Sequence, residues 1–271
     1  MSGSAFLPRL LATRTVEKVW GRDHLPPPFA TPPGKRIGEI WFEPPPELPR
    51  VLVKYIFTSE RLSVQVHPSV EQALPGEAGK EECWLVLDAE PGARLAIGFE
   101  REMTADEVEA AARDGSIETC LNWHPAQAGD FFYLPAGTVH AIGGGLSIVE
   151  IQQASDTTFR IYDYGRPREL HLERALEVAK LGTYDPKNSS KASSKHALVD
   201  GPWFRLNLVV GEPDEAIMIK YRGPMLALPL QGEIAAYSGS CKAIAGECLL
   251  ADGLNSLDFS ASKFTLLTQA T

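Results

Sequence analysis

The 271-residue chain lacks several features that would restrict its location or its partners. No apolar run approaches the roughly 20 residues needed to span a bilayer. Residues 1–13 contain no continuous apolar stretch preceded by basic residues, as a secretory signal would. The four cysteines are widely spaced and form no Cys-x-x-Cys pair, so we expect reduced thiols without a chemical role. We therefore predict a cytoplasmic protein with no membrane partner.

Basic residues are in the minority. The chain has 26 lysines and arginines against 35 acidic residues, which gives a formal net charge of −9. A field of this sign repels polyanions, so we expect no nucleic-acid partner. A local cluster of lysine and arginine can still bind a small anionic substrate. The composition leaves the oligomeric state open between a monomer and a homodimer.

Short segments of strand composition make up most of the chain, and proline clusters exclude helix between several of them. A clear helical pattern occurs over residues 103–118, where Thr104 and Glu107 are spaced as a capping box. The length is sufficient for a sizeable core. We predict an all-β fold, a jelly-roll barrel with a few packed helices. The segments with strand composition are residues 51–57, 62–67, 82–87, 93–99 and 131–134.

The composition changes near residue 185, where a run rich in serine and lysine has no apolar period. We predict a catalytic domain over residues 1–184, a flexible linker over 185–200 and a small β domain over 201–271. Residues 245–252 resemble residues 128–135 but lack the Pro-x-Gly turn and the following histidine. The C-terminal unit therefore reads as a degenerate copy with a structural role.

Four potential metal ligands lie in or beside the predicted strands. His140 follows a strand and a Pro-x-Gly turn, which together fix its position. Gln65 and His67 are two residues apart, so their side chains share one face of a strand. Glu82 opens another strand. Two imidazoles, one carboxylate and one amide suit Zn²⁺, with Mn²⁺, Co²⁺ or Fe²⁺ as possible alternatives.

The spacing of Gly129, Pro135, Gly137 and His140 is similar to the second signature of the cupin β-barrels. In the first cupin signature the carboxylate usually follows a histidine pair closely, whereas Glu82 comes fifteen positions after the histidine at 67. This departure is the pattern of one subfamily.

Four motifs follow one another along the chain: Gln65-Val-His67-Pro68, Gly79-Lys80-x-Glu82-Cys-Trp84, Gly137-Thr-Val-His140-Ala and Asp156-Thr-Thr-Phe-Arg160-Ile-Tyr-Asp163. In this order they resemble the type I mannose-6-phosphate isomerases (phosphomannose isomerases), in particular their short bacterial form. The resemblance implies one zinc ion per chain, held by Gln65, His67, Glu82 and His140. The neighbouring Glu81 is the competitor for the acidic ligand, and the spacing Lys-x-Glu of the family selects Glu82.

The same resemblance implies interconversion of mannose 6-phosphate and fructose 6-phosphate through an enediolate. It makes Arg160 the catalytic arginine, places Lys80 and Glu150 in the catalytic and substrate pocket, and places Ser63 and Lys54 near the substrate phosphate. A guanidinium stays protonated, so Arg160 would stabilise charge. Glu150, Lys80 and a hydroxide on the metal remain alternatives for the base.

Two other functions fit parts of the pattern. His67, Glu82 and His140 alone would form the two-histidine, one-carboxylate triad of a non-haem iron oxygenase. A fourth ligand, Gln65, argues against the open positions that such chemistry needs. A non-catalytic sugar-binding cupin is the other alternative, because the pocket wall is short and the C-terminal unit lacks ligands.

Overall fold

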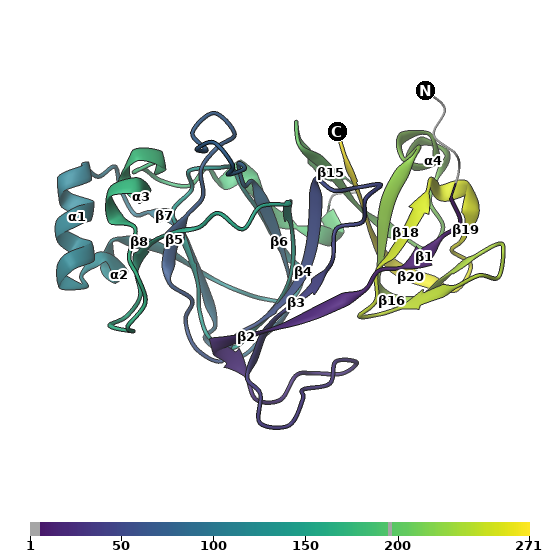
Figure 1. The fold of residues 1–271 in the computed structure, drawn as a ribbon, viewed down its shortest axis with the longest axis horizontal. Coiled ribbons are helices and arrows are strands. Elements are labelled where there is room, and N and C mark those ends of the chain that lie inside the picture. Colours follow the sequence, from purple (N-terminus) through teal and green to yellow (C-terminus); the bar gives the residue numbers. More distant parts are fainter. Residues whose placement is uncertain (1–5, 195–196) are drawn as a thin grey trace.

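The computed structural model describes residues 6–194 and 197–271 as two β units that pack side by side (Figure 1). The predicted all-β class is confirmed: strands dominate the described ranges, with four short α-helices among them. None of these helices is long and apolar enough to cross a membrane. Residues 1–5 of the predicted catalytic domain and residues 195–196 of the predicted linker lie outside the described residues.

The first unit is a barrel made of two antiparallel sheets. One sheet has seven strands in the order β13-β9-β6-β11-β4-β3-β2. Its strands are β2 (Thr13–Arg22), β3 (Ile37–Phe42), β4 (Val51–Phe57), β6 (Glu82–Ala89), β9 (Asp130–Leu134), β11 (Leu146–Gln153) and β13 (Ser189–Lys191).

The facing sheet has five strands in the order β12-β5-β10-β7-β8. Its outer side chains pack against α1, α2 and α3, at the left of Figure 1. The predicted capping box of Thr104 and Glu107 is present. The helix is shorter than the helical pattern over residues 103–118, because Gly115 ends α1 at a φ of 84°. The elements are β5 (Val64–Val66), β7 (Arg94–Phe99), β8 (Leu121–Pro125), β10 (His140–Ile142), β12 (Phe159–Tyr162), α1 (Ala105–Asp114), α2 (Ile117–Cys120) and α3 (Leu172–Val178).

Side chains inside the barrel change from apolar to polar along the strands. Ile56, Ile148 and Val86 form one cross-strand row, and they belong to an apolar cluster that fills one end of the barrel. Two positions further along the same strands, the inward side chains are charged or aromatic. The apolar end therefore forms a floor beneath a polar layer, which contains Lys54 and Glu150.

The second unit is built on a sheet in the order β1-β18-β16-β20-β15-β14, with β17 and β19 also paired to β16. β1 (Arg9–Leu10) pairs with β18, so the N-terminal segment belongs to this sheet. The predicted domain boundaries stay a prediction. The other elements are β14 (Ala197–Asp200), β15 (Phe204–Val210), α4 (Glu215–Lys220), β16 (Pro224–Ala236), β17 (Lys242–Ile244), β18 (Leu249–Asp252), β19 (Leu257–Asp258) and β20 (Ser262–Ala270).

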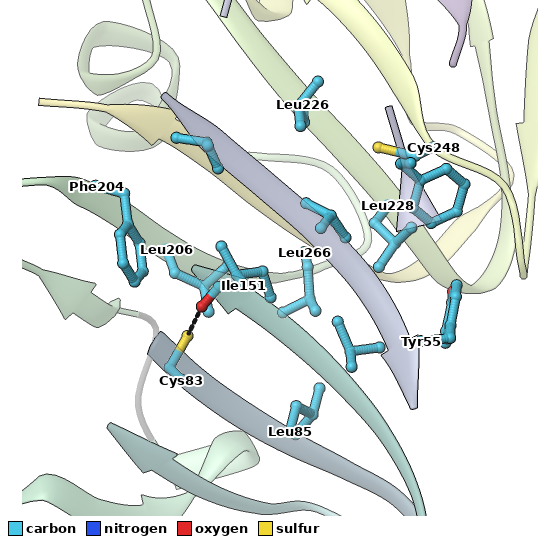
Figure 2. Packing of buried hydrophobic residues seen from close by; sticks show 14 of the residues in the cluster. Tyr55, Cys83, Leu85, Ile151, Phe204, Leu206, Leu226, Leu228, Cys248 and Leu266 are labelled. Carbon is cyan, nitrogen blue, oxygen red and sulfur yellow. Dashed lines mark hydrogen bonds between the residues drawn. The ribbon is translucent and has the colours of Figure 1, made fainter. Parts of the chain in front are cut away.

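One apolar core joins the two units. The outer face of the seven-stranded sheet contributes side chains such as Tyr55 and Leu85, and the C-terminal sheet contributes Leu228 and Leu266 (Figure 2). Cys83 lies in this core, and its thiol contacts the carbonyl oxygen of the residue at 151 at 3.5 Å. The C-terminal unit thus covers the sheet face that is opposite the polar layer.

The described part of the predicted linker forms regular structure. β13 adds to the edge of the seven-stranded sheet by pairing with β9, with Ser189 opposite Phe132. It lies between the short 3₁₀ turns η1 (Pro186–Asn188) and η2 (Ala192–Ser194). An edge strand needs backbone hydrogen bonds on one side only, so a polar segment without an apolar period can form one.

The two segments that resemble each other in sequence share a turn. Gly129 and Gly246 both have a positive φ, 85° and 93°. The acidic residue after each glycine accepts a hydrogen bond from the backbone N–H three residues earlier, at 2.8 Å for Asp130 and 3.0 Å for Glu247. The similarity between residues 128–135 and 245–252 therefore includes the conformation of the backbone turn.

Candidate metal centre

Three of the predicted ligands converge in the polar layer of the barrel. His67 directly follows β5, Glu82 is the first residue of β6 and His140 is the first residue of β10. All three are almost fully buried, and one ligand atom from each lies within 4.8 Å of the others. Nε2 of each histidine lies 3.4 Å from a different oxygen of Glu82.

Backbone carbonyls fix the orientation of both imidazoles. Nδ1 of His67 lies 2.9 Å from the carbonyl oxygen of Thr157, and Nδ1 of His140 lies 2.8 Å from that of Thr138. A carbonyl only accepts, so each Nδ1 is the protonated nitrogen and each Nε2 carries its lone pair. Two lone pairs and a carboxylate thus face one another, which is the arrangement of metal-binding histidines with their outer hydrogen bonds.

The carboxylate at the centre supports a cation. Both oxygens of Glu82 are buried, and neither makes a hydrogen bond of good geometry within the described ranges. Burial alone would raise the pKa of Glu82, but the ammonium of Lys80 beside it holds the pKa well below its usual value. Burial lowers the pKa of His67 to about 3. An ionised carboxylate with two neutral imidazoles fits a divalent cation such as Zn²⁺.

Lys80 lies next to this cluster and is buried. Its Nζ is 3.0 Å from Nε2 of His67 and 2.9 Å from Oε2 of Glu82. Burial opposes its charge, yet Glu82 and Glu150 raise the pKa of Lys80 above its ordinary value. The ammonium group is therefore a donor in the site.

Gln65 occupies the position of the predicted fourth ligand. In the five-stranded sheet it lies opposite His140 on one side and opposite Arg160 on the other. Its Nε2 is 3.2 Å from Nε2 of His140, and its Oε1 accepts from the hydroxyl of Ser63 at 3.2 Å. Metal binding would require the amide to turn by half a rotation so that Oε1 faces His140. The ligand role of Gln65 stays a prediction.

A second row of side chains crosses the facing sheet. Trp41, Lys54, Glu150 and Trp84 are direct cross-strand neighbours on β3, β4, β11 and β6. Nζ of Lys54 lies 3.2 Å from Oε1 of Glu150 and 4.2 Å from the centre of the Trp41 ring. The indole N–H of Trp84 donates to Oε2 of Glu150 at 3.0 Å. Both oxygens of Glu150 are therefore held by donors.

The charges of the polar layer favour an added cation. Two buried lysines, Lys54 and Lys80, share this layer with three buried glutamates, Glu39, Glu82 and Glu150. Their formal sum is −1, and a divalent cation would change it to +1. Glu39 is held by the indole N–H of the tryptophan at 41 (2.9 Å) and by the ammonium of the lysine at 18 (3.2 Å). A loaded centre would therefore attract an anionic substrate.

Arg160 lies on β12 opposite Gln65, so the two side chains share the inner face of the sheet. Its Nη1 donates to the carbonyl oxygen of Glu169 at 2.6 Å, and its Nε is buried without a hydrogen bond in the described chain. Burial, followed by repulsion from Arg168, lowers the pKa of Arg160. The guanidinium thus has an unused donor on the side of the barrel that contains the cluster.

The competitor for the acidic ligand points away. The carboxylate of Glu81 accepts a hydrogen bond from the hydroxyl of Tyr133, and its backbone N–H donates to the side chain of Gln153 at 2.8 Å. Neighbouring residues of a strand face opposite sides. The structure therefore brings Glu82, and not Glu81, to the two histidines.

Sequence reasoning missed Glu39, Trp41 and Trp84 as residues of the site. Trp84 occurs in one of the four motifs, but no role was predicted for it. Glu39 was detectable in principle, because a charged residue stands inside the apolar segment from 37 to 42. A buried strand retains such a residue only when it has partners.

The structure thus belongs to the class of antiparallel β barrels with a buried cluster of two histidines and one carboxylate that could hold a metal ion. Within that class, the chain is 43% identical over 150 residues to "Mannose-6-phosphate isomerase" of Streptococcus mutans, which covers 52% of this chain and 46% of that protein. The predicted resemblance is confirmed in sequence. No family model matches the chain.

Solved structures extend the similarity to the whole fold. The crystal structure of the mannose 6-phosphate isomerase from Bacillus subtilis superposes with a TM-score of 0.80 and 24% identity, over 97% of this chain and all of that one. A zinc-bound mannose 6-phosphate isomerase superposes with a TM-score of 0.69 and 13% identity, over 98% of this chain and 100% of that one. The chain therefore has the fold of these isomerases. Its sequence matches span about half the length of the curated relatives.

Proposed function

We propose that the chain is a metal-dependent aldose-ketose isomerase that interconverts mannose 6-phosphate and fructose 6-phosphate. One observation carries the proposal: His67, Glu82 and His140 converge with both carboxylate oxygens free of good hydrogen bonds, beside the ammonium of Lys80. The similarity to proteins named as mannose-6-phosphate isomerases supports the substrate. We further assign the first unit to the cupin barrels.

The proposed cofactor is one zinc ion per chain, held by His67, Glu82, His140 and Gln65. The donor set suits this borderline cation, and a zinc-bound isomerase has the same fold. When bound, the cation supplies positive charge beside the reacting oxygens of the substrate.

Glu150 is the residue that we assign to proton transfer between C1 and C2 of the sugar. Its carboxylate is buried, and donors from Lys54 and Trp84 hold its two oxygens in place. Lys80 directs its ammonium at His67 and Glu82, so it is placed as a donor. A carboxylate held in this way is oriented, as a general base must be.

We assign Lys80 and Arg160 to the stabilisation of the negative charge that develops during the reaction. Removing a proton next to the carbonyl group produces an enediolate, and cationic donors that are already oriented lower the energy of that species. Nε of Arg160 has no partner in the described chain, so it is available for an oxyanion. Ser63 remains our candidate for a phosphate contact. We assign Lys54 to the orientation of Glu150, because its ammonium is buried against that carboxylate.

The test is a coupled assay of the purified protein, loaded with zinc, for fructose 6-phosphate formed from mannose 6-phosphate. Unphosphorylated mannose is run alongside to measure the contribution of the phosphate. A His140→Gln variant serves as the control, because it removes one predicted ligand and keeps a polar side chain. Binding of the sugar phosphate without ketose product would favour a non-catalytic sugar-binding barrel. Iron in the purified protein together with oxygen uptake would favour the oxygenase.

A further inference from the structure

The segment between β12 and α3, residues 163–171, is fixed by one buried carboxylate. The side chain of Asp163 is 1% exposed. Arg168 binds it with two parallel hydrogen bonds, Nε to Oδ2 at 2.6 Å and Nη2 to Oδ1 at 2.5 Å. Arg166 adds a third contact to Oδ1 at 3.3 Å. A bidentate guanidinium–carboxylate pair has a defined geometry, so it determines where Arg168 lies.

The residue after Arg168 holds the guanidinium that we assign to catalysis. The carbonyl oxygen of Glu169 accepts from Nη1 of Arg160 at 2.6 Å. The segment also closes on the backbone of Arg160: the N–H of His171 donates to the carbonyl of Arg160 at 2.7 Å, and Nδ1 of His171 accepts from the N–H of Arg160 at 3.1 Å. Contacts therefore run without a break from Asp163 to Arg160.

The backbone of this segment depends on its contacts. Tyr164 has a φ of +54°, the only such non-glycine residue in the described ranges, and Gly165 follows with a φ of +75°. A bulky residue adopts this conformation only where its surroundings impose it. The guanidinium groups of Arg61 and Arg166 lie 5.3 and 5.5 Å from the centre of the Tyr164 ring. Nη2 of Arg166 donates to the carbonyl of Arg61 at 2.6 Å.

We propose that Asp163 is a positioning residue for Arg160: its ion pair with Arg168 sets the carbonyl of Glu169, and that carbonyl aims the guanidinium into the site. The inference rests on the proposed function. Without the carboxylate, the guanidinium groups at 160, 166 and 168 lose the shared anion and repel one another. The segment then releases Glu169, and Arg160 loses its orientation while keeping its charge.

The test is a double-mutant cycle on isomerase activity with Asp163→Asn, Arg160→Lys and the double variant. Lysine keeps the charge at position 160 but lacks the guanidinium group that donates to the carbonyl oxygen of Glu169. We expect Asp163→Asn alone to lower kcat/KM about tenfold, mainly through kcat, and to change it by less than about twofold in the Arg160→Lys background. Asp200→Asn, at an exposed ion pair with the lysine at 220 in the other unit, is the matched control without effect.

The outcomes separate the inference from the function on which it rests. An equal loss from Asp163→Asn in both backgrounds, or an Arg160→Lys variant as active as the wild type, would overturn the positioning role. An inactive wild-type protein with zinc would overturn the proposed function itself. If Asp163→Asn does not fold, Arg168→Lys takes its place in the cycle, because it keeps the charge and loses the bidentate pair. The same two outcomes then apply.

Discussion

The ammonium of Lys54 and the carboxylate of Glu150 form a buried ion pair, 3.2 Å apart, between neighbouring strands of the barrel. A buried pair is tolerated only when its remaining donors and acceptors are also satisfied. Trp84 provides the second donor to the carboxylate, and the ring of Trp41 covers the ammonium. The ion pair and the two tryptophans therefore hold the carboxylate of Glu150 in a fixed position inside the polar layer. The ion pair supports the proposed role of Lys54 in orienting Glu150, and the phosphate contact of Lys54 stays a prediction.

Trp84→Phe tests whether the hydrogen bond from the indole N–H to Glu150 contributes to turnover. The variant keeps an aromatic ring in the barrel but removes the N–H that Glu150 accepts. A hydrogen bond to a charged group contributes about 1.5–3 kcal/mol, so we expect kcat to fall roughly tenfold or more. Steady-state kinetics on folded protein measures the change. Trp203→Phe, in the C-terminal unit, is the matched control. Equal kinetics for the two variants would show that the indole N–H of Trp84 has no part in turnover.

Arg160→Ala should lower kcat by on the order of 100-fold, as the loss of a transition-state charge partner does. The fold should remain, because Arg160 is only partly buried and makes one side-chain hydrogen bond in the described chain. Circular dichroism and metal content verify the fold, and stopped assays give kcat. Turnover within about twofold of the wild type would remove Arg160 from the mechanism.

Metal removal should abolish activity, and zinc should restore it. The cluster of His67, Glu82 and His140 has no other cation than Lys80 within contact distance in the described residues. Binding to the folded state alone also raises stability by mass action. We therefore expect the melting temperature to rise with zinc concentration, and a His67→Gln, His140→Gln variant to lack this rise. Full activity after exhaustive chelation would contradict the metal-dependent mechanism.

The stability of the metal-free protein should decrease as the pH falls below about 6.5. Burial lowers the pKa of His67 to about 3 and also lowers that of His140. Both imidazoles stay neutral in the folded state and bind protons on unfolding, so the stability present above pH 6.5 is lost as the pH falls. Each proton contributes about 1.4 kcal/mol per pH unit. Urea unfolding at several pH values measures the slope. The His67→Gln, His140→Gln variant should show a smaller slope, and an unchanged one would assign the effect to other groups.

The convergence of His67, Glu82 and His140 could be predicted from the sequence because its signals are local. The Pro-x-Gly turn fixes His140, and the Lys-x-Glu spacing of the family that the chain resembles selects Glu82 over Glu81. The all-β class follows for the same reason, since short segments and their turns report strands directly.

The rest of the site depends on register between strands that are distant in sequence. Trp41, Lys54, Trp84 and Glu150 form one row only because four strands pair at particular positions. Core packing sets those positions, and no local pattern contains them. The pairing of β13 with β9 has the same origin, because the two strands are distant in sequence.

The shared core predicts that the two units unfold together. Leu266 is buried between them, at 1% exposure, and packs with side chains of the seven-stranded sheet. Leu266→Ala should lower the free energy of unfolding by about 2–5 kcal/mol, and calorimetry should show one transition that moves as a whole. Ile219→Ala, on the exposed side of α4, should change stability by less than about 0.5 kcal/mol. Because the core lies behind the sheet that carries Glu82 and Glu150, zinc retention should be lost in the same transition. Two separate transitions, with the barrel unaffected by Leu266→Ala, would instead show that the C-terminal unit is an independent domain.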